Sequence, residues 1–478
     1  MPVNFWFDRN PSQPWEPLTT ILSDRPLDKA ASVSSASTRA SSYRGYAGRR
    51  GKAAVMLLLI WGGMISLHFL SWGVWVIWGL TGLVGVHGLR TILSSPPRRQ
   101  LTSVSTSISR ETPPPYVSFL IPAKNEEAAI APLIEMLDQL DYPGDRYDIW
   151  AIDDNSSDGT PELLDTLSQQ YDRLQVLHRD HTARGGKSGA LNQAVRLAQG
   201  EIIAIFDADA QVSSDFLWRV LPLFEGDRVG AVQVRKVISN ASDNLWTQGQ
   251  RLEMILDAYL QEQRVALGGI GELRGNGQVI RRSALERCGH FNEETITDDL
   301  DLTLRLHLDH WDIDCVTLPT VREEGVTQPL ALWHQRSRWA EGGYQRYLDY
   351  WRLLCGRRLS LSKRFDLLVF LWIQYLLPTA ALPDLLLSLV RTRLPLLSPM
   401  TTLTISLSLV WMGLGLRRVN RQEGKQPPLP LLLRDTIQGT LYMLHWLLVM
   451  VATTARLAVR PKRLKWVKTV HRGVQESH

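Results

Sequence analysis

Hydrophobic residues change their spacing from one region of the chain to the next. Between Tyr116 and Leu318, short apolar runs alternate with segments in which apolar residues recur every three or four positions, which predicts strands alternating with helices. Strands are expected at 116–121, 148–152, 174–177, 202–206 and 229–234, and helices at 126–140 and 188–198. Such alternation is typical of an α/β domain on a mostly parallel sheet.

A long apolar segment precedes this domain. From Ala53 to Leu89 the chain has no Asp, Glu, Lys or Arg. A single helix of that length would extend about 55 Å, whereas the hydrocarbon core of a bilayer is about 30 Å thick. We therefore expect a transmembrane hairpin within residues 51–92, with a turn near Ser71 to Gly73. Basic residues flank both ends, so the positive-inside rule places both in the cytoplasm. A signal peptide is disfavoured, because a long polar stretch comes first and no cleavage site stands out.

The region after the domain also has helical and apolar patterns. A stripe from Tyr344 to Cys355 predicts an amphipathic helix at the membrane surface, within residues 344–365; packing on the domain core is the alternative. Residues 366–458 are expected to form a transmembrane or re-entrant bundle. Its last segment, 431–457, is interrupted by polar residues, and if it spans the membrane the basic tail lies outside, against the charge rule. Asp384, inside an apolar segment, is expected to face protein or water.

The remaining segments are polar. Residues 1–50 are rich in Ser, Arg and Pro and are expected to be a mobile tail, 93–115 a linker, and 459–478 a basic tail. The catalytic domain would then occupy 116–343.

Composition narrows the class of protein. The chain has 478 residues and a net charge of +5. Its basic residues gather beside the apolar segments, which favours anionic lipid headgroups as their partner over nucleic acid. The three cysteines have no metal-ligand spacing and suit a reducing compartment.

Polar residues that can carry chemistry follow the predicted strands. Asp207 and Asp209 come directly after strand 202–206, at the sheet edge where open α/β folds bind ligands. Mg²⁺ takes one or two carboxylates and completes its shell with water and phosphates, so the pair suggests a nucleoside diphosphate ligand. Taken alone, the pair can also be a solvated turn.

Two further motifs suit a nucleotide. Asp154, after the second strand, can accept hydrogen bonds from a base or ribose, although helix capping explains its neighbours Ser156 to Asp158. Lys187 lies in a glycine-rich stretch at a helix start, where backbone amides and the ammonium suit an anion. That stretch lacks the P-loop frame, which argues against ATP binding by that route.

Two motifs near the end of the domain complete the set. Asp298, Asp299 and Asp301 crowd one helix start, and such crowding can raise a pKa and supply a general base; acidic decoration of the first turn is the alternative. Arg338 can stabilise a phosphate leaving group and Trp339 can form the wall of a sugar site, or both can anchor the chain to a membrane.

Taken together and in this order, these motifs resemble those of family 2 inverting glycosyltransferases with a GT-A fold, of the membrane-embedded kind that includes cellulose, hyaluronan and poly-N-acetylglucosamine synthases. The likeness covers residues 116–345. The resemblance implies contacts of Asp154 and Lys187 with UDP, and a metal site for Mg²⁺, or Mn²⁺, at Asp207 and Asp209. It further implies that Asp299 is the base, with Asp298 standing where the family usually has Glu. The other positions that it implies are Gln335, Arg338 and Trp339 for the donor, and Gly275, Asn276, Gly277 and Asp298 for the acceptor.

The acceptor class depends on the membrane segments. A hairpin with a short C-terminal bundle offers fewer spans than polymer synthases use, and it suits an acceptor that already lies in the bilayer. The overall plan resembles cyanobacterial monoglucosyldiacylglycerol synthases, which implies UDP-glucose as donor, 1,2-diacylglycerol as acceptor and a cytosolic catalytic domain on the thylakoid or plasma membrane. A processive polysaccharide synthase and a catalytically silent nucleotide-binding scaffold remain the alternatives.

Overall fold

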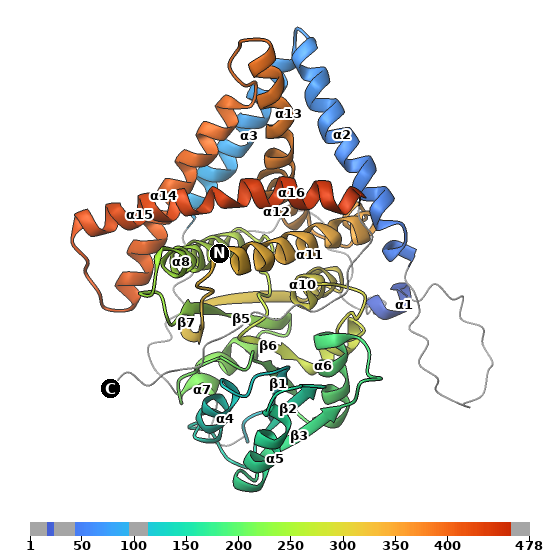
Figure 1. The fold of residues 1–478 in the computed structure, drawn as a ribbon, viewed down its shortest axis with the longest axis vertical. Helices are drawn as coiled ribbons and strands as arrows, with labels where there is room; N and C mark the ends of the chain where they lie inside the picture. The colour runs from blue at the N-terminus through green and yellow to red at the C-terminus, as the bar shows by residue number, and fades with distance from the viewer. Residues whose placement is uncertain (1–16, 23–43, 95–112, 460–478) are drawn as a thin grey trace, which may run out of the picture.

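The computed structural model describes residues 17–22, 44–94 and 113–459. Figure 1 shows an α/β domain at one end of the molecule and an arm of long helices at the other. The polar linker and the basic tail predicted from the sequence lie almost entirely outside the described residues.

A seven-stranded sheet forms the centre of the α/β domain, with strand order β3-β2-β1-β4-β6-β5-β7. Strands β1, β2, β3 and β4 are parallel to one another, β5 is parallel to β7, and β6 runs antiparallel to both of its partners, β4 and β5. The strands are β1 Val117–Ala123, β2 Tyr147–Asp154, β3 Leu174–Arg179, β4 Ile202–Ile205, β5 Val229–Ile238, β6 Gln278–Arg281 and β7 Asp312–Glu323. The mostly parallel sheet expected from the sequence is therefore confirmed.

Both faces of the sheet are buried, which explains why its strands are apolar runs without strict alternation. Phe119 and Ile121 of β1 pack on one face with helices α4, α5 and α7, whereas Leu120 packs on the other with α6, α9 and α10. These helices are α4 Ile130–Asp138, α5 Thr160–Gln170, α6 Gly186–Leu197, α7 Phe216–Val220, with η2 Leu221–Glu225 after it, α9 Arg282–Arg287 and α10 Asp298–Leu308.

Two long helices lie between the sheet and the arm: α8 Leu245–Ala266 and α11 Pro329–Cys355. Asn244 begins α8 with a capping box, because its side chain accepts from the Thr247 amide while the Thr247 hydroxyl accepts from the Asn244 amide. The predicted boundary between residues 343 and 344 is wrong, since α11 continues through it without a break.

The first part of the apolar stripe of α11 faces protein, whereas Trp351, further along it, is 49% exposed. Tyr344, Tyr347 and Leu348 are buried in a cluster with residues of α10 and α16. The alternative interpretation of this stripe, a helix packed on the domain core, therefore describes it better than a membrane-surface helix.

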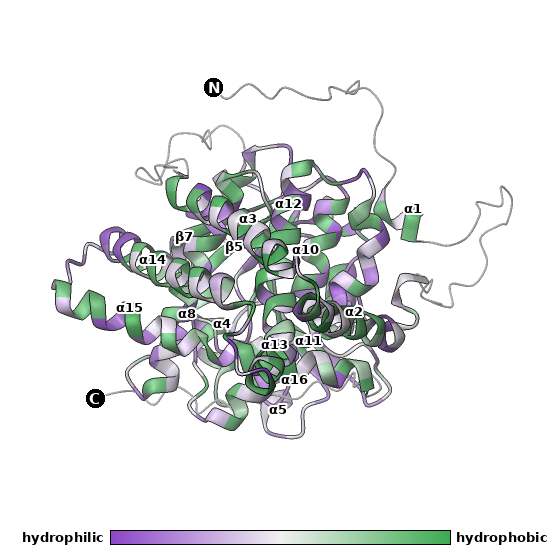
Figure 2. Cartoon of the chain, turned by 90° about the horizontal axis from the view of Figure 1, so that it is seen from above, coloured by the Kyte–Doolittle hydropathy of each residue, from purple (hydrophilic) through white to green (hydrophobic). Residues whose placement is uncertain are grey.

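Four helical rods build the arm. They are α2 Arg49–Phe69, α3 Gly73–Leu93, the nearly continuous α12 Leu361–Leu371, η3 Trp372–Leu376 and α13 Leu377–Val390, and α14 Ser398–Gln422. The hairpin and its turn agree with the sequence prediction. Large apolar side chains such as Leu58 and Trp75 are exposed along the arm, and Figure 2 shows hydrophobic residues dominating these helices. Such surfaces suit contact with lipid.

Asp384 is buried inside the arm, with 1% of its surface exposed. Its carboxylate lies 2.8 Å from His68 Nε2 and accepts from the amides of Leu396 and Leu397. The expectation that Asp384 faces protein is confirmed.

Helices α15 Leu429–Met443 and α16 His445–Val459 follow a break at Leu444. Figure 1 shows α16 running across the base of the arm, above α11, rather than along the arm. One face of the pair exposes large apolar residues, whereas Val449 and Met450 are buried against the protein. The exposed residues are Leu433, Ile437, Leu441, Leu444 and Leu448, which we call the α15–α16 stripe. An exposed apolar face of this kind suits contact with lipid.

The prediction of a mobile tail over residues 1–50 is wrong for the part that the structure describes. Helix α1 Leu18–Leu22 docks on the domain, because Leu18 is fully buried and its amide donates to Asp309 Oδ1 at 2.9 Å. Turn η1 Arg44–Tyr46 leads into α2, where Arg49 pairs with Asp349 at 2.6 Å. Burial of Leu18 and the ion pair of Arg49 therefore help to hold segments that composition alone marks as polar.

Candidate active site

A cleft opens at the edge of the sheet where β1 and β4 end. It brings together residues that lie far apart in the sequence and that were predicted to act together. The predicted residues that line it are Lys187, Asp207, Asp209, Gly275, Asp298, Asp299, Gln335, Arg338 and Trp339. Asp154, Asn276 and Gly277 do not line it.

The two aspartates after β4 face the cleft beside a cation. Lys187 Nζ donates to Asp207 Oδ1 at 2.6 Å, and Asp209 Oδ2 accepts from the Glu324 amide at 2.9 Å. Burial would lower the pKa of Lys187, but the carboxylates of Asp207 and Asp298 raise it above its usual range. Among the described residues no group of three or more His, Cys, Asp or Glu side chains is placed to hold a metal. Two carboxylates at an open cleft therefore fit an ion that takes its other ligands from phosphate and water.

The start of α6 forms a turn of two glycines. Gly185 and Gly186 have φ values of 84° and 51°, a left-handed conformation that glycine adopts at little cost. Arg179 is paired with Asp154 and donates to the Gly186 carbonyl oxygen at 3.1 Å. Asp154 thus lies behind this turn and supports it through Arg179.

The three aspartates of α10 occupy different surroundings. Asp301 is buried away from the cleft, where it accepts from Arg305 Nε at 2.6 Å and from the Tyr350 hydroxyl at 2.8 Å. Asp298 and Asp299 line the cleft. Burial and then the charge of Asp298 raise the pKa of Asp299 to about 6. Asp299 therefore combines a position on the cleft with a pKa suited to a base near neutral pH.

Close packing between α10 and α11 places Asp299 and Arg338 on one wall. A β-carbon on Gly342 of α11 would lie 2.1 Å from the Thr297 hydroxyl, so the start of α10 can approach the α11 backbone only because Gly342 has no side chain. Burial lowers the pKa of Arg338, and the nearby carboxylates of Asp207 and Asp299 act against this.

The segment before β6 borders Asp299. Gly275 has a φ of 83°, and a β-carbon there would lie 3.4 Å from Asp299 Oδ2. Asn276 is buried behind the wall, where its Oδ1 accepts from the Asp207 amide at 3.2 Å and its Nδ2 donates to Glu323. Asn276 therefore supports the metal-site strand rather than facing the cleft.

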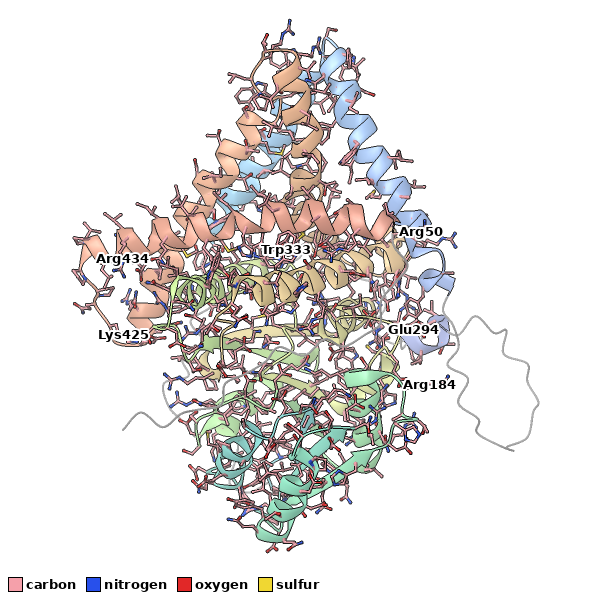
Figure 3. The ribbon with its side chains drawn as sticks, viewed as in Figure 1. Arg50, Arg184, Glu294, Trp333, Lys425 and Arg434 are labelled. Atoms are coloured by element: carbon pink, nitrogen blue, oxygen red, sulfur yellow. The ribbon has the colours of Figure 1, made fainter. Side chains whose placement is uncertain are left out.

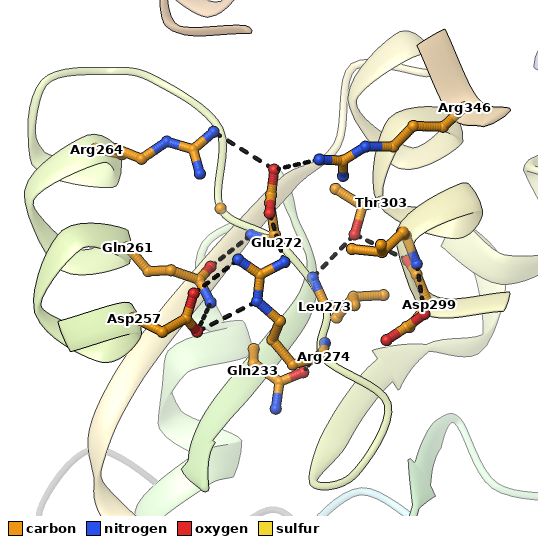
Figure 4. Close-up of polar contacts among 12 residues, drawn as sticks. Gln233, Asp257, Gln261, Arg264, Glu272, Leu273, Arg274, Asp299, Thr303 and Arg346 are labelled. Carbon is orange, nitrogen blue, oxygen red and sulfur yellow. Dashed lines mark hydrogen bonds and ion pairs between the residues drawn. The ribbon is translucent and has the colours of Figure 1, made fainter. Parts of the chain in front are cut away.

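A buried cluster of charges holds this segment, as Figure 4 shows. Glu272 is fully buried, and its carboxylate lies 2.6 Å from Arg274 Nη1, 3.0 Å from Arg346 Nη2 and 3.5 Å from Arg264 Nη2. Asp257 binds Arg274, and Asp366 binds Arg264, each at 2.8–2.9 Å. Three guanidinium groups thus meet three carboxylates, and α8, α11 and α12 are tied to the wall of the cleft.

Sequence reasoning missed several residues that line the cleft. Lys236, Arg274, Glu323 and Glu324 all do so, and Lys236 Nζ lies 3.1 Å from Glu323 Oε1. Lys236 and Glu323 lie near the ends of β5 and β7, whose pairing continues to Ile238 and Glu323. Strand β7 was not predicted, because Asp and Pro residues interrupt its apolar pattern, and without it these side chains have no place.

Residues 118–289 match the model of "Glycosyl transferase family 2". The β-monoglucosyldiacylglycerol synthase of Nostoc sp. is 54% identical over 477 residues, which cover 100% of both chains. The enzyme of the same name from Synechocystis sp. is 52% identical over 436 residues, 91% of each chain.

Among solved structures, the mannosyltransferase PcManGT from Pyrobaculum calidifontis, in complex with GDP-Man and Mn²⁺, aligns with a TM-score of 0.53 and 20% identity. The alignment covers 85% of this chain and 99% of that one. This likeness concerns the fold, and it agrees with the GT-A architecture expected for the α/β domain. Because relatives more than half identical match along the full length, the chain belongs to the β-monoglucosyldiacylglycerol synthase family of glycosyltransferases.

Proposed function

We propose that this protein transfers glucose from UDP-glucose to 1,2-diacylglycerol with inversion, giving β-monoglucosyldiacylglycerol. The observation that carries the proposal is that the similarity to β-monoglucosyldiacylglycerol synthases extends over the whole chain, arm included. The position of the cleft supports it, because the arm lies next to the domain that contains it.

Asp299 would act as the base. Its carboxylate would take the proton from the acceptor hydroxyl, whose oxygen attacks the anomeric carbon on the face opposite UDP. The bond from that carbon to the UDP oxygen breaks as the new bond forms, so the configuration inverts. Arg338, on the same wall, would offset the negative charge that grows on the leaving diphosphate.

Lys187 and the amides at the start of α6 would bind the diphosphate, since both line the cleft. Trp339 and Gln335 would contact the sugar or acceptor from α11, and Gly275 and Asp298 would border the acceptor. Asp154, Asn276 and Gly277 would act from behind the wall. Asp207 and Asp209 would hold Mg²⁺ or Mn²⁺, which supplies positive charge to the diphosphate when bound.

The decisive experiment incubates the purified full-length protein with diacylglycerol and a panel of labelled UDP-sugars. We expect a chloroform-soluble lipid with a single β-linked glucose, and one UDP released for each glucose transferred. A long glycan would support the polysaccharide-synthase alternative instead. Nucleotide binding without any sugar transfer would support the scaffold.

Removal of the metal should stop transfer. Because the two carboxylates are proposed to hold the ion through which the diphosphate is neutralised, Asp209→Asn should lower kcat by about a hundredfold or more. EDTA should do the same to the wild type, and titration with Mg²⁺ or Mn²⁺ should restore the rate. The control is Asp215→Asn, since Asp215 follows the same strand but does not line the cleft. A rate insensitive to EDTA would contradict the metal site.

Activity should be lost in acid with the titration of Asp299. The carboxyl has a pKa of about 6 and must be deprotonated to act, so kcat/KM should be constant above that pH and fall below it. Asp298→Asn removes a neighbouring negative charge that raises this pKa, so its acid limb should move to lower pH. An acid limb that moves upward in Asp298→Asn would contradict the assignment.

The protein is membrane-associated, since five helical segments are long and apolar enough to cross a membrane within the described residues. They are Arg49–Phe69, Gly73–Leu93, Leu361–Val390, Ser398–Gln422 and Leu429–Val459. We propose that the first four cross it and that α15 and α16, which make up the fifth, lie at its surface. An even number of crossings then leaves both ends of the chain on the side of the catalytic domain.

The distribution of charge supports a cytosolic catalytic domain. Figure 3 shows Arg50, Lys425 and Arg434 at the domain end of the arm. The far end has fewer basic residues, Arg391 and Arg393. The positive-inside rule then orients the domain end toward the cytoplasm.

Cysteine labelling tests this topology. An impermeant maleimide should reach Leu394→Cys, at a site 85% exposed at the far end of the arm, only from the non-cytosolic side. It should reach Lys425→Cys only from the cytosolic side. Labelling of both from one side would contradict four crossings.

A further inference from the structure

A series of side-chain contacts, which we call the contact chain, connects the cleft to helix α16. Its centre is Arg336 of α11, which is fully buried. Arg336 Nη1 donates to Gln335 Oε1 at 2.9 Å, and its guanidinium carbon lies 4.1 Å from the centre of the Trp339 ring. Gln335 and Trp339 both line the cleft. One buried cation therefore contacts two of the side chains that α11 presents to the substrates.

The other side of Arg336 is joined to α16 through the carboxylate of Glu253, and the Arg336 guanidinium carbon also lies 5.8 Å from the centre of the Trp446 ring. Arg336 Nη2 donates to Glu253 Oε2 at 2.5 Å, and the indole nitrogen of Trp446 donates to Glu253 Oε1 at 2.8 Å. Glu253 belongs to α8, and Trp446 is in the first turn of α16. Hydrogen bonds to a charged group are stronger than neutral ones. Because both bonds share the Glu253 carboxylate, a displacement of Trp446 would also disturb the bond between Glu253 and Arg336.

Trp339 has a second cation beside its ring. Lys236 Nζ lies 5.2 Å from the centre of the ring, and Lys236 is itself paired with Glu323. The ring therefore contacts two cations, one from β5 and one from α11. Attraction between a cation and an aromatic face contributes most where water is excluded, which is the situation of the buried Arg336.

Helices α15 and α16, at the far end of the contact chain, have one face free of protein. The α15–α16 stripe is apolar and exposed, and it lies beside the base of the arm whose helices are proposed to cross the bilayer. Helix α15 is fixed to α8 by the ion pair between Arg251 and Asp435 at 2.8 Å, and the Tyr442 ring packs against Gly249 of α8. A lipid surface is the occupant that an exposed apolar stripe at the foot of a membrane arm fits.

We propose that Trp446, Glu253 and Arg336 are positioning residues that set Gln335 and Trp339 for the acceptor when the α15–α16 stripe rests on lipid. The proposal rests on the proposed function, because it concerns the acceptor side of the same reaction. The three residues touch neither substrate: they act by holding two residues that do. Transfer to an acceptor in the bilayer is thereby tied to the seating of the protein on that bilayer.

Steady-state kinetics in phosphatidylcholine vesicles containing diacylglycerol test the contact chain of Trp446, Glu253 and Arg336. Trp446→Phe keeps an aromatic ring and removes the N–H donor, so we expect kcat/KM for diacylglycerol to fall about tenfold. KM for UDP-glucose should stay within about twofold. Glu253→Gln should have a similar effect, and the double variant should lose little more than either single one, because both changes break the same chain. Arg336→Lys should lower kcat/KM for diacylglycerol as well, although it keeps the positive charge. An ammonium cannot bridge Gln335 and Glu253 as the planar guanidinium does.

The matched control is Trp351→Phe, because Trp351 is an exposed tryptophan of α11 that takes no part in the contact chain. It should change neither kcat/KM for diacylglycerol nor KM for UDP-glucose. Additive losses in the double variant, or equal rises in KM for both substrates with a parallel fall in thermal stability, would mean a merely structural role. Unchanged kinetics in Trp446→Phe would overturn the proposal outright.

A second measurement does not depend on the acceptor. Hydrogen exchange of the peptide that contains residues 335–339 should slow when the wild-type protein moves from detergent into phosphatidylcholine nanodiscs, and Trp446→Phe should lose that change. If the wild type makes no glucolipid, the proposed function fails, while the exchange result still decides whether the contact chain transmits the contact with lipid. Identical exchange of wild type and variant in nanodiscs would reject the contact chain even if the protein makes the glucolipid.

Discussion

Asp299→Asn should abolish sugar transfer while leaving the protein folded and able to bind UDP. The amide keeps the size of the carboxylate and its contact with the Leu300 amide, but it cannot accept the proton of the acceptor hydroxyl. A positioned base contributes about 10²–10⁴ to the rate, so kcat should fall by about a hundredfold to ten-thousandfold. Single-turnover transfer to diacylglycerol and calorimetric titration with UDP measure the two properties separately.

The neighbouring carboxylate supplies the comparison. Asp298→Asn should lower kcat far less, because Asp298 is proposed to border the acceptor without taking its proton. Should Asp298→Asn prove the more damaging change, the base would have to be reassigned to that residue. Near-normal turnover in Asp299→Asn would remove the proposed mechanism altogether.

Glu272→Gln should destabilise the protein strongly, although Glu272 does not touch the cleft. The variant leaves three buried guanidinium groups with two carboxylates, and it turns amide hydrogens toward Arg274 or Arg346. Although burial would raise the pKa of Glu272, the adjacent arginines hold it well below its usual range, so the side chain is charged in the folded protein. Breaking a buried ion pair from one side costs about 3–5 kcal/mol.

The loss should appear as a fall of about 10 °C in the apparent Tm of the detergent-solubilised protein. Glu286→Gln is the matched control, because the Glu286 side chain is 51% exposed and lies 3.9 Å from Arg282. A surface pair of this kind contributes about 0–1 kcal/mol. An apparent Tm for Glu272→Gln within about 2 °C of the wild type would show that the cluster does not need its central charge.

The sequence predicted most of the α/β domain because its signal is local. Runs such as Ile202–Ile205 are apolar, short and followed at once by polar residues, so both the strand and the edge at which Asp207 lies can be read directly. The hairpin was equally plain, since a charge-free segment of that length has few alternatives.

What could not be predicted depends on contacts between distant segments. Nothing near Arg274 indicates that it meets Asp257, because α8 and the segment before β6 come together only in the fold. The stripe of α11 shows that one face is apolar but does not show whether lipid or α16 covers it. Helix α1 presents the same difficulty on a smaller scale. The spacing of Leu18, Ile21 and Leu22 suits one turn of helix, but it does not show that Leu18 packs on the domain.

The ion pair between Arg49 and Asp349 joins the first turn of α2 to α11, and Arg49 Nη1 also donates to the Glu294 carbonyl oxygen at 2.7 Å. Helix α2 is therefore held directly against the domain that contains the cleft. With α2 anchored in a bilayer, the active site would stay at a constant height above the leaflet. A glucolipid made at that height could drift away sideways among its neighbours without ever entering water.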